Sequence, residues 1–308
     1  MQINTFPEFS TLTLDDKAEY DRLISDYPPL SDITFSTLQI WWNLEDKLQI
    51  ALLNDNLVID YYLPFDDENS GYSLIGKHDV DQSFEILFDH LKANNKTQKI
   101  VHVPEFVKDQ LRNPENFEFV EETDYNEYIL DPVGLAELPG SRHAKIRTQL
   151  NRFNRETEHM NLEIKPLDLS DEANKQKLYD HVIKWEDQQK SNNDPDHIER
   201  EAIQKTLKHS HKLGTRNLGL YADDELRAVI IYHPSHDNNS YIINHLKVDY
   251  SIPYIYDYMV HHLAKTANKE NIQFLNMEMD LGIENLRRHK QDFKPIDFFR
   301  KYSVRLKS

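Results

Sequence analysis

Three apolar runs that follow one another between residues 215 and 248 constrain the fold most strongly. They read "TRNLGLYA", "ELRAVIIYH" and "SYIINHLKV", and short polar turns separate them. Runs of this length, rich in branched and aromatic residues and joined by tight turns, predict an antiparallel meander. Further strands are expected at 272–279 and 298–306. Because helical spacing also predicts covering helices, the second half of the chain reads as α+β, with helices at 171–190, 197–212 and 255–268.

The first half shows the same alternation of strands and helices. Two apolar runs within 48–63 meet at the Asn-Asp-Asn turn of residues 54–56, which tolerates left-handed geometry and predicts a hairpin. Further strands, the last two closing the first unit, are expected at 71–76, 99–103, 117–122 and 125–130. Because 308 residues exceed the usual size of one domain, we expect two domains, residues 1–135 and 136–308.

The formal charge divides unevenly between the two halves. The chain carries −17 at pH 7, of which residues 1–140 contribute −19 and residues 141–308 contribute +2. An acidic surface repels polyanions, whereas a near-neutral surface with basic patches can admit them. The asymmetry suggests two units with different electrostatic roles; the alternative is that the acidic half is simply soluble.

The chain has no cysteine, which removes disulfides, thiolate ligands and thiol nucleophiles and points to a reducing compartment. The first residues lack a basic start followed by an apolar core, and no apolar run approaches about 18 residues, so neither a signal peptide nor a transmembrane segment is expected. We expect a cytoplasmic protein. The His-rich stretches at 209–211 and 261–262 lack carboxylate or Cys partners at ligand spacing, so no metal site is expected.

Residues 142–157 predict an amphipathic helix with an unusual outer face. Ile146, Leu150 and Phe153 fall on one side at helical spacing. The outer face carries five basic residues: Arg142, Lys145, Arg147, Arg152 and Arg155. We interpret this face as a site for a polyanion such as RNA or a phosphate-rich ligand; the alternative is an ordinary solvated helix face.

The stretch "NMEMDLGIENLRRHK", which begins at Asn276, places polar residues at the end of an apolar strand. Glu278 and Asp280 alternate with apolar residues, so one strand face becomes polar. Either carboxylate could hold or deprotonate an attacking amine or hydroxyl, and Arg287 and Lys290 could hold a phosphate or a carboxylate. The alternative is structural: Asp280 caps the next helix, and the basic residues pair with the carboxylates.

Recognised motifs for nucleophiles and phosphate loops are missing from the sequence. It contains no Gly-x-Ser-x-Gly elbow, Walker loop or glycine-rich dinucleotide turn, so Ser, Thr and Lys nucleophiles have no signature. Trp185, in "KWEDQQKSNN", is a candidate for the floor of a ligand pocket, with burial in the core as the alternative.

Three segments together resemble the C-terminal catalytic domain of bacterial phosphatidylglycerol lysyltransferases and its soluble relatives. They are "DYNEYIL", the Lys/Arg-rich "LAELPGSRHAKIRTQLNRF", and "NMEMDLGIENLRRHK" followed by "KP", which is similar to the family pattern Asn-x-Glu-x-Asp-x-Gly, Leu-Arg, Lys, Pro. The resemblance implies two tandem domains of the Gcn5-related N-acetyltransferase (GNAT) fold, each a mixed, mostly antiparallel sheet flanked by helices. It also implies an active site in the second domain and aminoacyl-tRNA as the donor.

The chain departs from these relatives in three respects. It has no counterpart of the membrane-spanning half of the lipid-modifying enzymes, so a lipid acceptor is not expected. Coenzyme A-dependent acetyltransferases follow their central strand with a glycine loop whose amides hold the pyrophosphate, and "NHLKVDYSIPYIYDY" has no glycine there. The soluble relatives have a Glu-Lys pair where this chain has Leu246 and Lys247.

We therefore expect an aminoacyltransferase that moves an amino acid from aminoacyl-tRNA to a small-molecule hydroxyl or amine, with no cofactor required. Asp280 or Glu278 would orient or deprotonate the acceptor, and the basic helix would bind the tRNA backbone. The substrate site would be completed by Asn276, Arg287, Lys290, Lys247 and Trp185. Two alternatives stay open: an N-acyltransferase that uses acyl-CoA, and a catalytically degenerate binding protein of the same fold.

Overall fold

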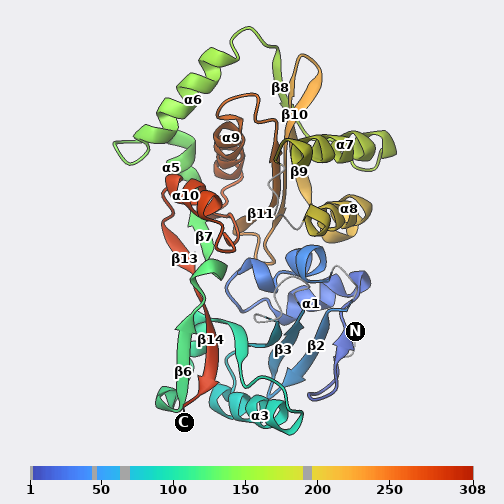
Figure 1. Ribbon diagram of the computed structural model, residues 1–308, viewed down its shortest axis with the longest axis vertical. Coiled ribbons are helices and arrows are strands. Elements are labelled where there is room, and N and C mark those ends of the chain that lie inside the picture. Colours follow the sequence, from blue (N-terminus) through green and yellow to red (C-terminus); the bar gives the residue numbers. More distant parts are fainter. Residues whose placement is uncertain (1–2, 44–46, 63–69, 190–195, 308) are drawn as a thin grey trace.

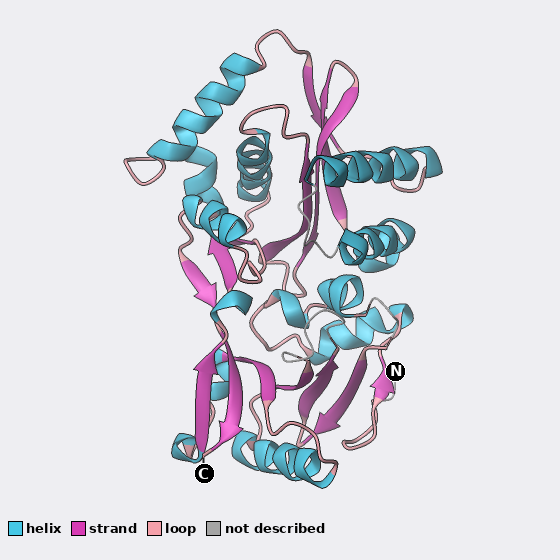
Figure 2. Ribbon diagram, in the orientation of Figure 1, coloured by secondary structure: helices cyan, strands magenta, loops and turns pink. Residues whose placement is uncertain are grey.

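The computed structural model describes four stretches of the 308-residue chain: residues 3–43, 47–62, 70–189 and 196–307. Two expected elements, at 48–63 and 171–190, each end one residue outside these stretches. The described residues form an elongated molecule of two lobes, and both ends of the chain lie in the same lobe (Figure 1). Helices cover the sheets (Figure 2), so the predicted α+β class with mixed, mostly antiparallel sheets is confirmed.

The first lobe, which holds the chain ends, contains two small antiparallel sheets. The four-stranded sheet has the order β1-β2-β3-β4: Ser10–Thr11, Gln49–Leu53, Asn56–Tyr61 and Gly71–Ile75. The three-stranded sheet has the order β5-β14-β6: Ile100–Pro104, Lys301–Leu306 and Phe117–Glu121. The predicted hairpin is confirmed as β2–β3, and Asn54 and Asp55 in its turn are left-handed, with φ of 50° and 60°.

A seven-stranded sheet forms the centre of the second lobe. Its order is β13-β7-β12-β11-β10-β9-β8: Asp297–Phe299, Glu127–Leu130, Phe274–Asn276, Ser240–Val248, Glu225–Pro234, Arg216–Ala222 and Leu162–Lys165. The predicted meander is confirmed as β9–β10–β11. Among the pairings of this sheet, β11 with β12 is parallel and the others are antiparallel.

Helices cover both faces of this sheet. One face is covered by α5, α6 and α9: Pro132–Glu137, Ala144–Glu156 and Ile255–Lys269. The other is covered by α7 and α8: Glu172–Gln189 and Asp196–Leu213. Neighbouring residues of β10 enter different cores, because Ile230 packs with the α6 and α9 side whereas Ile231 packs with the α7 and α8 side. The amphipathic helix predicted at 142–157 is confirmed as α6.

The other helices are short, apart from α3. They are η1 (Leu14–Asp16), α1 (Lys17–Leu23), η2 (Ser31–Ile33), α2 (Phe35–Thr37), η3 (Leu38–Trp42), α3 (Val80–Ala93), α4 (Glu105–Lys108), η5 (Pro114–Asn116), η6 (Thr123–Tyr125) and α10 (Glu284–Asp292). α2 is continued directly by η3, which is a single stretch of π-helix. π-Helical turns occur frequently at functional sites.

Two strands cross between the lobes, against expectation. The run 125–130 was expected to close the first unit, but β7 pairs with β12 and β13 of the second lobe. One strand was expected at 298–306, but it divides at Arg300, and β14 lies between β5 and β6 of the first lobe. Both pairings join segments far apart in sequence, which local patterns do not report.

The strand expected at 272–279 is also shorter than predicted. β12 ends at Asn276, and Glu278 has a left-handed φ of 56° that a strand does not contain. The side chains of Asn276 and Asp280 each accept a bond from the backbone amide two residues on, Glu278 N and Gly282 N, both at 2.8 Å. Such side-chain turns compete with strand pairing, so the three polar residues do not share one strand face.

The exchanged strands predict that neither half folds alone. A fragment of residues 1–135 lacks β14, which leaves β5 and β6 unpaired in the first lobe, and a fragment of residues 136–308 lacks β7. Each fragment expressed alone is expected to give no cooperative thermal transition by circular dichroism. Co-expression is expected to restore one. A cooperative transition in either isolated fragment would show that the strand exchange is dispensable.

Candidate active site

The contact between the lobes contains buried polar groups beside apolar ones. The segment η2–α2–η3 turns its apolar residues, among them Phe35 and Leu38, into the core of the first lobe. Its hydroxyl groups face the second lobe: the Ser36 hydroxyl donates to the carbonyl of Leu213 at 2.6 Å, and Asn244 Nδ2 donates to the Thr37 hydroxyl at 3.2 Å. Polar side chains from both lobes are therefore buried against each other.

A buried ion triad lies at the centre of this contact. The ammonium of Lys301, at the start of β14, binds Glu127 Oε1 at 2.8 Å and also Asp32 Oδ2, and all three side chains are at most 4% exposed. Burial acts to lower the pKa of Lys301, but the two carboxylates outweigh it and raise the pKa. Burial raises the pKa of Asp32 despite the ammonium. The triad connects three segments that are distant in sequence.

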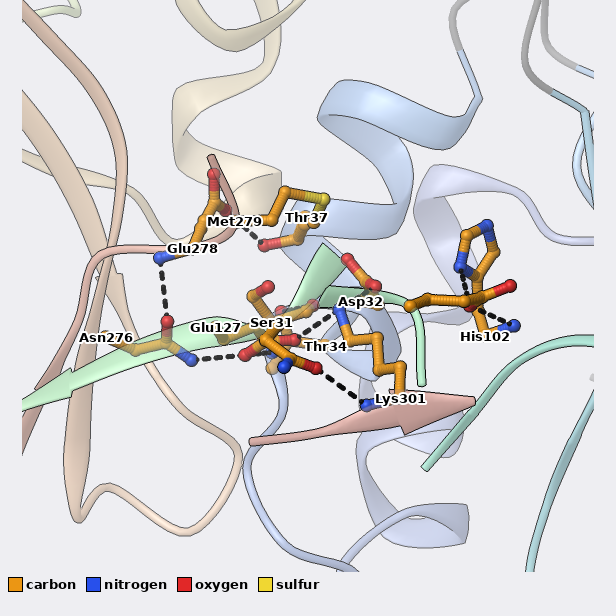
Figure 3. Close-up of polar contacts among 12 residues, drawn as sticks. Ser31, Asp32, Thr34, Thr37, His102, Glu127, Asn276, Glu278, Met279 and Lys301 are labelled. Carbon is orange, nitrogen blue, oxygen red and sulfur yellow. Dashed lines mark hydrogen bonds and ion pairs between the residues drawn. The ribbon is translucent and has the colours of Figure 1, made fainter. Parts of the chain in front are cut away.

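Glu127 connects this triad to the loop after β12. Its Oε2 accepts bonds from the backbone amide of Ser31 at 2.7 Å and from Asn276 Nδ2 at 2.5 Å. Asn276 in turn accepts the bond from the amide of Glu278, so a chain of polar contacts runs from Lys301 to Glu278 (Figure 3). The side chain of Asn276 donates one of these bonds and accepts another, which positions Glu278.

Glu278 is a half-buried carboxyl group between the lobes. Its Oε1 accepts bonds from Asn244 Nδ2 at 2.9 Å and from the Thr37 hydroxyl at 3.3 Å. Burial raises the pKa of Glu278 to about 8; Lys290 opposes this rise, whereas the charges of Asp32 and Glu127 add to it. A carboxyl group with a pKa near the working pH can take up and release a proton during a reaction.

Asn244 reaches Glu278 because β11 bulges at this position. Ile231 and Tyr232 pair with residues 245 and 243, so Asn244 is the extra residue of the strand. Its Oδ1 lies 2.7 Å from His233 Nδ1, and burial lowers the pKa of His233 to about 4. The neutral ring lies between Asn244 and the hydroxyl of Thr34, which is 3.1 Å from Nε2, and its contact with Asn244 holds that side chain beside Glu278.

Asp280 is fully engaged in bonds to neighbouring groups. Its carboxylate accepts from Tyr128 OH at 2.5 Å, from Gly282 N at 2.8 Å, and from Arg287 at 2.9 Å and 2.8 Å. Burial acts to raise the pKa of Asp280, but the bonds from Arg287 and Tyr128 lower it. Arg287 also binds Asp124 at 2.5 Å. Asp280 and Arg287 together fix the start of α10.

Lys290 is buried behind the same loop. Its ammonium donates to the carbonyls of Met277 at 2.6 Å and Met279 at 2.5 Å. Burial lowers the pKa of Lys290 to about 8, although the carboxylate of Glu278 acts against this shift. Lys290 therefore holds the backbone on both sides of Glu278 and tunes the proton affinity of its carboxyl.

Lys247 and Trp185 meet on the other face of β11, under α7 and α8. The Lys247 ammonium lies 3.9 Å from the centroid of the Trp185 ring and is paired with Glu199 of α8. The structure thus brings the predicted site residues into two groups. One group follows β12 and contains the residues from Asn276 to Lys290, and the other contains Lys247 and Trp185.

The five basic residues around α6 form a third, separate group, and each of them contacts a group of the chain itself. Arg142 donates to the carbonyls of Lys294 and Pro295 at 2.7 and 3.1 Å, Lys145 pairs with Asp292, and Arg147 donates to the carbonyl of Leu138. The remaining two, Arg152 and Arg155, are exposed; Arg152 contacts Tyr254 OH at 3.0 Å and Arg155 contacts Glu156 at 3.3 Å.

Sequence reasoning missed the buried polar residues that other segments supply to the site. They are Asp32, Thr37, Glu127, His233, Asn244 and Lys301, with a His102–Glu122 pair (2.9 Å) beside Asp32. One signal was present: polar residues stand inside apolar strand runs, as in "YNEYIL" and "YIINHLKV". Such residues are buried at a cost unless they are paired, so each one marks a partner elsewhere in the chain.

In the stretches of chain that the structure describes, no group of three or more metal-binding side chains comes together. None of the helices described there is long and apolar enough to cross a membrane.

Mixed sheets flanked by helices, with a polar site after the central strands, give this α+β chain the same fold as FemX. Residues 72–305 match the family model described as "Phosphatidylglycerol lysyltransferase, C-terminal". The chain belongs to this family, and the predicted resemblance is confirmed.

Solved structures share the same fold. A conserved protein of unknown function from Bacteroides thetaiotaomicron VPI-5482 is 25% identical with a TM-score of 0.84, covering 97% of this chain and 99% of that chain. L-PGS from Bacillus licheniformis is 13% identical with a TM-score of 0.61, covering 100% and 95%. FemX is 8% identical with a TM-score of 0.56, covering 97% of each. A comparison with curated proteins gave no match.

The ion triad predicts a large and pH-dependent effect of Lys301→Met. The variant leaves two carboxylates buried together without a cation, which is expected to lower the free energy of unfolding by about 3–5 kcal/mol at pH 7. Their pKa values in the folded state would rise above those in the unfolded state, so the folded variant binds more protons. Its stability deficit is therefore expected to shrink between pH 7 and pH 5.

Urea denaturation measures both effects, and Lys212→Met is the matched control. Lys212 pairs with Asp15 on the surface, where the two side chains are 50% and 82% exposed. Its loss is expected to change stability by less than about 1 kcal/mol at either pH. A similarly small, pH-independent change in Lys301→Met would contradict the role given to the triad.

Proposed function

We propose that the protein is an aminoacyltransferase that moves an amino acid from aminoacyl-tRNA to a small hydroxyl or amine acceptor. The observation that carries this proposal is the carboxyl of Glu278, held between the lobes by Asn244 and Thr37 with a pKa near 8. Membership of a lysyltransferase family supports transfer of an aminoacyl group in general. The identities of the donor, aminoacyl-tRNA, and of the acceptor are part of what we propose.

The proposed reaction needs only positioning and proton transfer, because the ester of the donor is already activated. The acceptor oxygen or nitrogen attacks the ester carbonyl carbon, and its proton passes to Glu278. The bond between that carbon and the ribose oxygen of the tRNA then breaks. The leaving oxygen takes the proton from Glu278, which returns the carboxylate for the next turnover.

The surroundings of the two candidate carboxyls favour Glu278 over Asp280 as the proton carrier. Four bonds and an ion pair with Arg287 stabilise the charged form of Asp280, which makes it a poor base. We assign Asp280 and Arg287 to positioning of the loop. Asn276 and Lys290 act through Glu278, the first by holding its amide and the second by lowering its proton affinity.

Substitution of Glu278 tests this assignment. Glu278→Gln keeps the bonding atoms but cannot accept the proton, so the rate of transfer is expected to fall by about 10²–10⁴-fold while the thermal transition stays in place. Glu284→Gln, an exposed residue of α10, is the matched control and is expected to keep full activity. Equal activity of the two variants would contradict the role of Glu278 as proton carrier.

The pH dependence of transfer gives an independent test. Because the pKa of Glu278 is raised to about 8, the reactive carboxylate is a minor form at pH 6. The rate is therefore expected to rise with pH and to level off above about pH 8, after subtraction of spontaneous ester hydrolysis. The residual activity of Glu278→Gln is expected to be independent of pH between 6 and 9. The same pH-independence in the unsubstituted protein would show that proton transfer to Glu278 does not limit the rate.

The exposed end of α6 is proposed to contact the tRNA backbone. Arg152→Glu with Arg155→Glu is expected to weaken tRNA binding and to reduce the slope of log K against log salt by about 2. The control reverses two exposed basic residues of the first lobe, Arg22 and Lys92, and is expected to leave the slope unchanged. Filter binding at several salt concentrations measures this, and the absence of any tRNA affinity at low salt would remove the donor from the proposal.

A further inference from the structure

A second polar cluster lies on the α7 and α8 side of β11, one residue beyond the bulge. His245 and Lys247 stand two positions apart on the strand and so face the same side. Lys247 is 5% exposed, with its ammonium over the ring of Trp185 and paired with Glu199. The ring of Trp41, from η3 of the first lobe, lies 5.0 Å from that of His245.

His245 offers a buried lone pair. Its Nε2 lies 3.1 Å from the hydroxyl of Thr206, and that hydroxyl already donates to the carbonyl of Ala202 at 2.8 Å. The hydroxyl oxygen therefore accepts from His245 Nε2–H, which leaves Nδ1 as a hydrogen-bond acceptor. Burial and the nearby Lys247 charge lower the pKa of His245, so the ring is neutral. Among the described residues, neither Nδ1 of His245 nor Nε1 of Trp41 has a hydrogen-bond partner.

The pairing of Lys247 with Glu199 is asymmetric. The side chain of Lys247 is 5% exposed, and its ammonium lies over the indole ring of Trp185. The side chain of Glu199, on the first turns of α8, is 35% exposed. A buried ion pair contributes little to stability compared with apolar residues of the same size. The cluster therefore combines a buried cation, a more exposed carboxylate and polar atoms without a partner. These features fit a ligand site in which Glu199 takes the place of the ligand.

We propose that this cluster is the subsite for the acceptor, and that it takes an acceptor carrying an anionic group, a carboxylate or a phosphate. Lys247 binds that group, Glu199 occupies its place in the free protein and is displaced, and His245 Nδ1 accepts a bond from an O–H or N–H of the acceptor. Asn244, which holds Glu278, precedes His245 on β11, so this strand connects the cluster to the proton carrier. Its role as acceptor subsite rests on the proposed aminoacyl transfer; anion binding itself does not.

Titration of the whole protein with sodium acetate and, separately, with inorganic phosphate tests the proposal, with sodium chloride keeping the ionic strength constant. The chain has three Trp residues, so the indole N–H signal of Trp185 can be followed by NMR and assigned with Trp185→Phe. Saturable shifts with acetate alone identify a carboxylate subsite, and saturable shifts with phosphate alone identify a phosphate subsite.

Four variants test how the anion is bound. Glu199→Gln removes the competing carboxylate and is expected to tighten anion binding about fivefold or more, because a charge beside Lys247 is worth at least that factor even in water. Glu201→Gln, exposed on the same helix, is expected to change nothing. Lys247→Met is expected to abolish binding and Lys247→Arg to retain it. Equal anion affinity in Glu199→Gln, Glu201→Gln and Lys247→Met, or no saturable binding in any of them, would overturn the subsite.

This experiment is separable from the test of transfer. Glu278→Gln is expected to bind the anion normally while losing transfer. Anion binding without any transfer from charged tRNA would leave the anion site in place and remove the proposed function. Transfer that is unaffected by Lys247→Met would leave the proposed function in place and remove the role of the cluster as acceptor subsite.

Discussion

The buried ion triad of Lys301, Asp32 and Glu127 is the constraint on which the rest of the structure depends. Each member comes from a different segment, and two of these segments, β7 and β14, are the strands that cross between the lobes. Because an unpaired buried charge is far costlier than a paired one, the three segments can be buried only together. The relative position of the lobes follows from this.

The carboxylates of the same triad add to the effect of burial on Glu278. Two carboxylates share one ammonium, so the triad carries an excess negative charge that opposes ionisation of a third carboxyl nearby. Glu127 also holds Asn276, and Asn276 holds the backbone of Glu278. Burial is the main cause of the raised pKa of Glu278, the triad carboxylates add to it, and Lys290 partly opposes it. Strand exchange, which local folding does not require, brings these charges to the interface.

Local patterns in the sequence predicted local structure well. The meander at 215–248, the hairpin at 48–63 and the amphipathic helix at 142–157 all depend on periodicity and turn residues within one segment. Pairings between distant segments were beyond such patterns, so β7 and β14 were assigned to the wrong neighbours. The candidate site shows the same division. Glu278 was found from its neighbours in the chain, whereas Asp32 and Lys301 contribute through contacts that span most of it.

The central claim is that contact between the lobes makes Glu278 a proton carrier near neutral pH. The most direct measurement is the titration of its side-chain carboxyl by ¹³C NMR in protein labelled at Glu, with the signal assigned by its loss in Glu278→Gln. The account predicts a midpoint of about 8. A midpoint near the ordinary value of about 4.3 would contradict it, because the carboxyl would then be ionised throughout the working range.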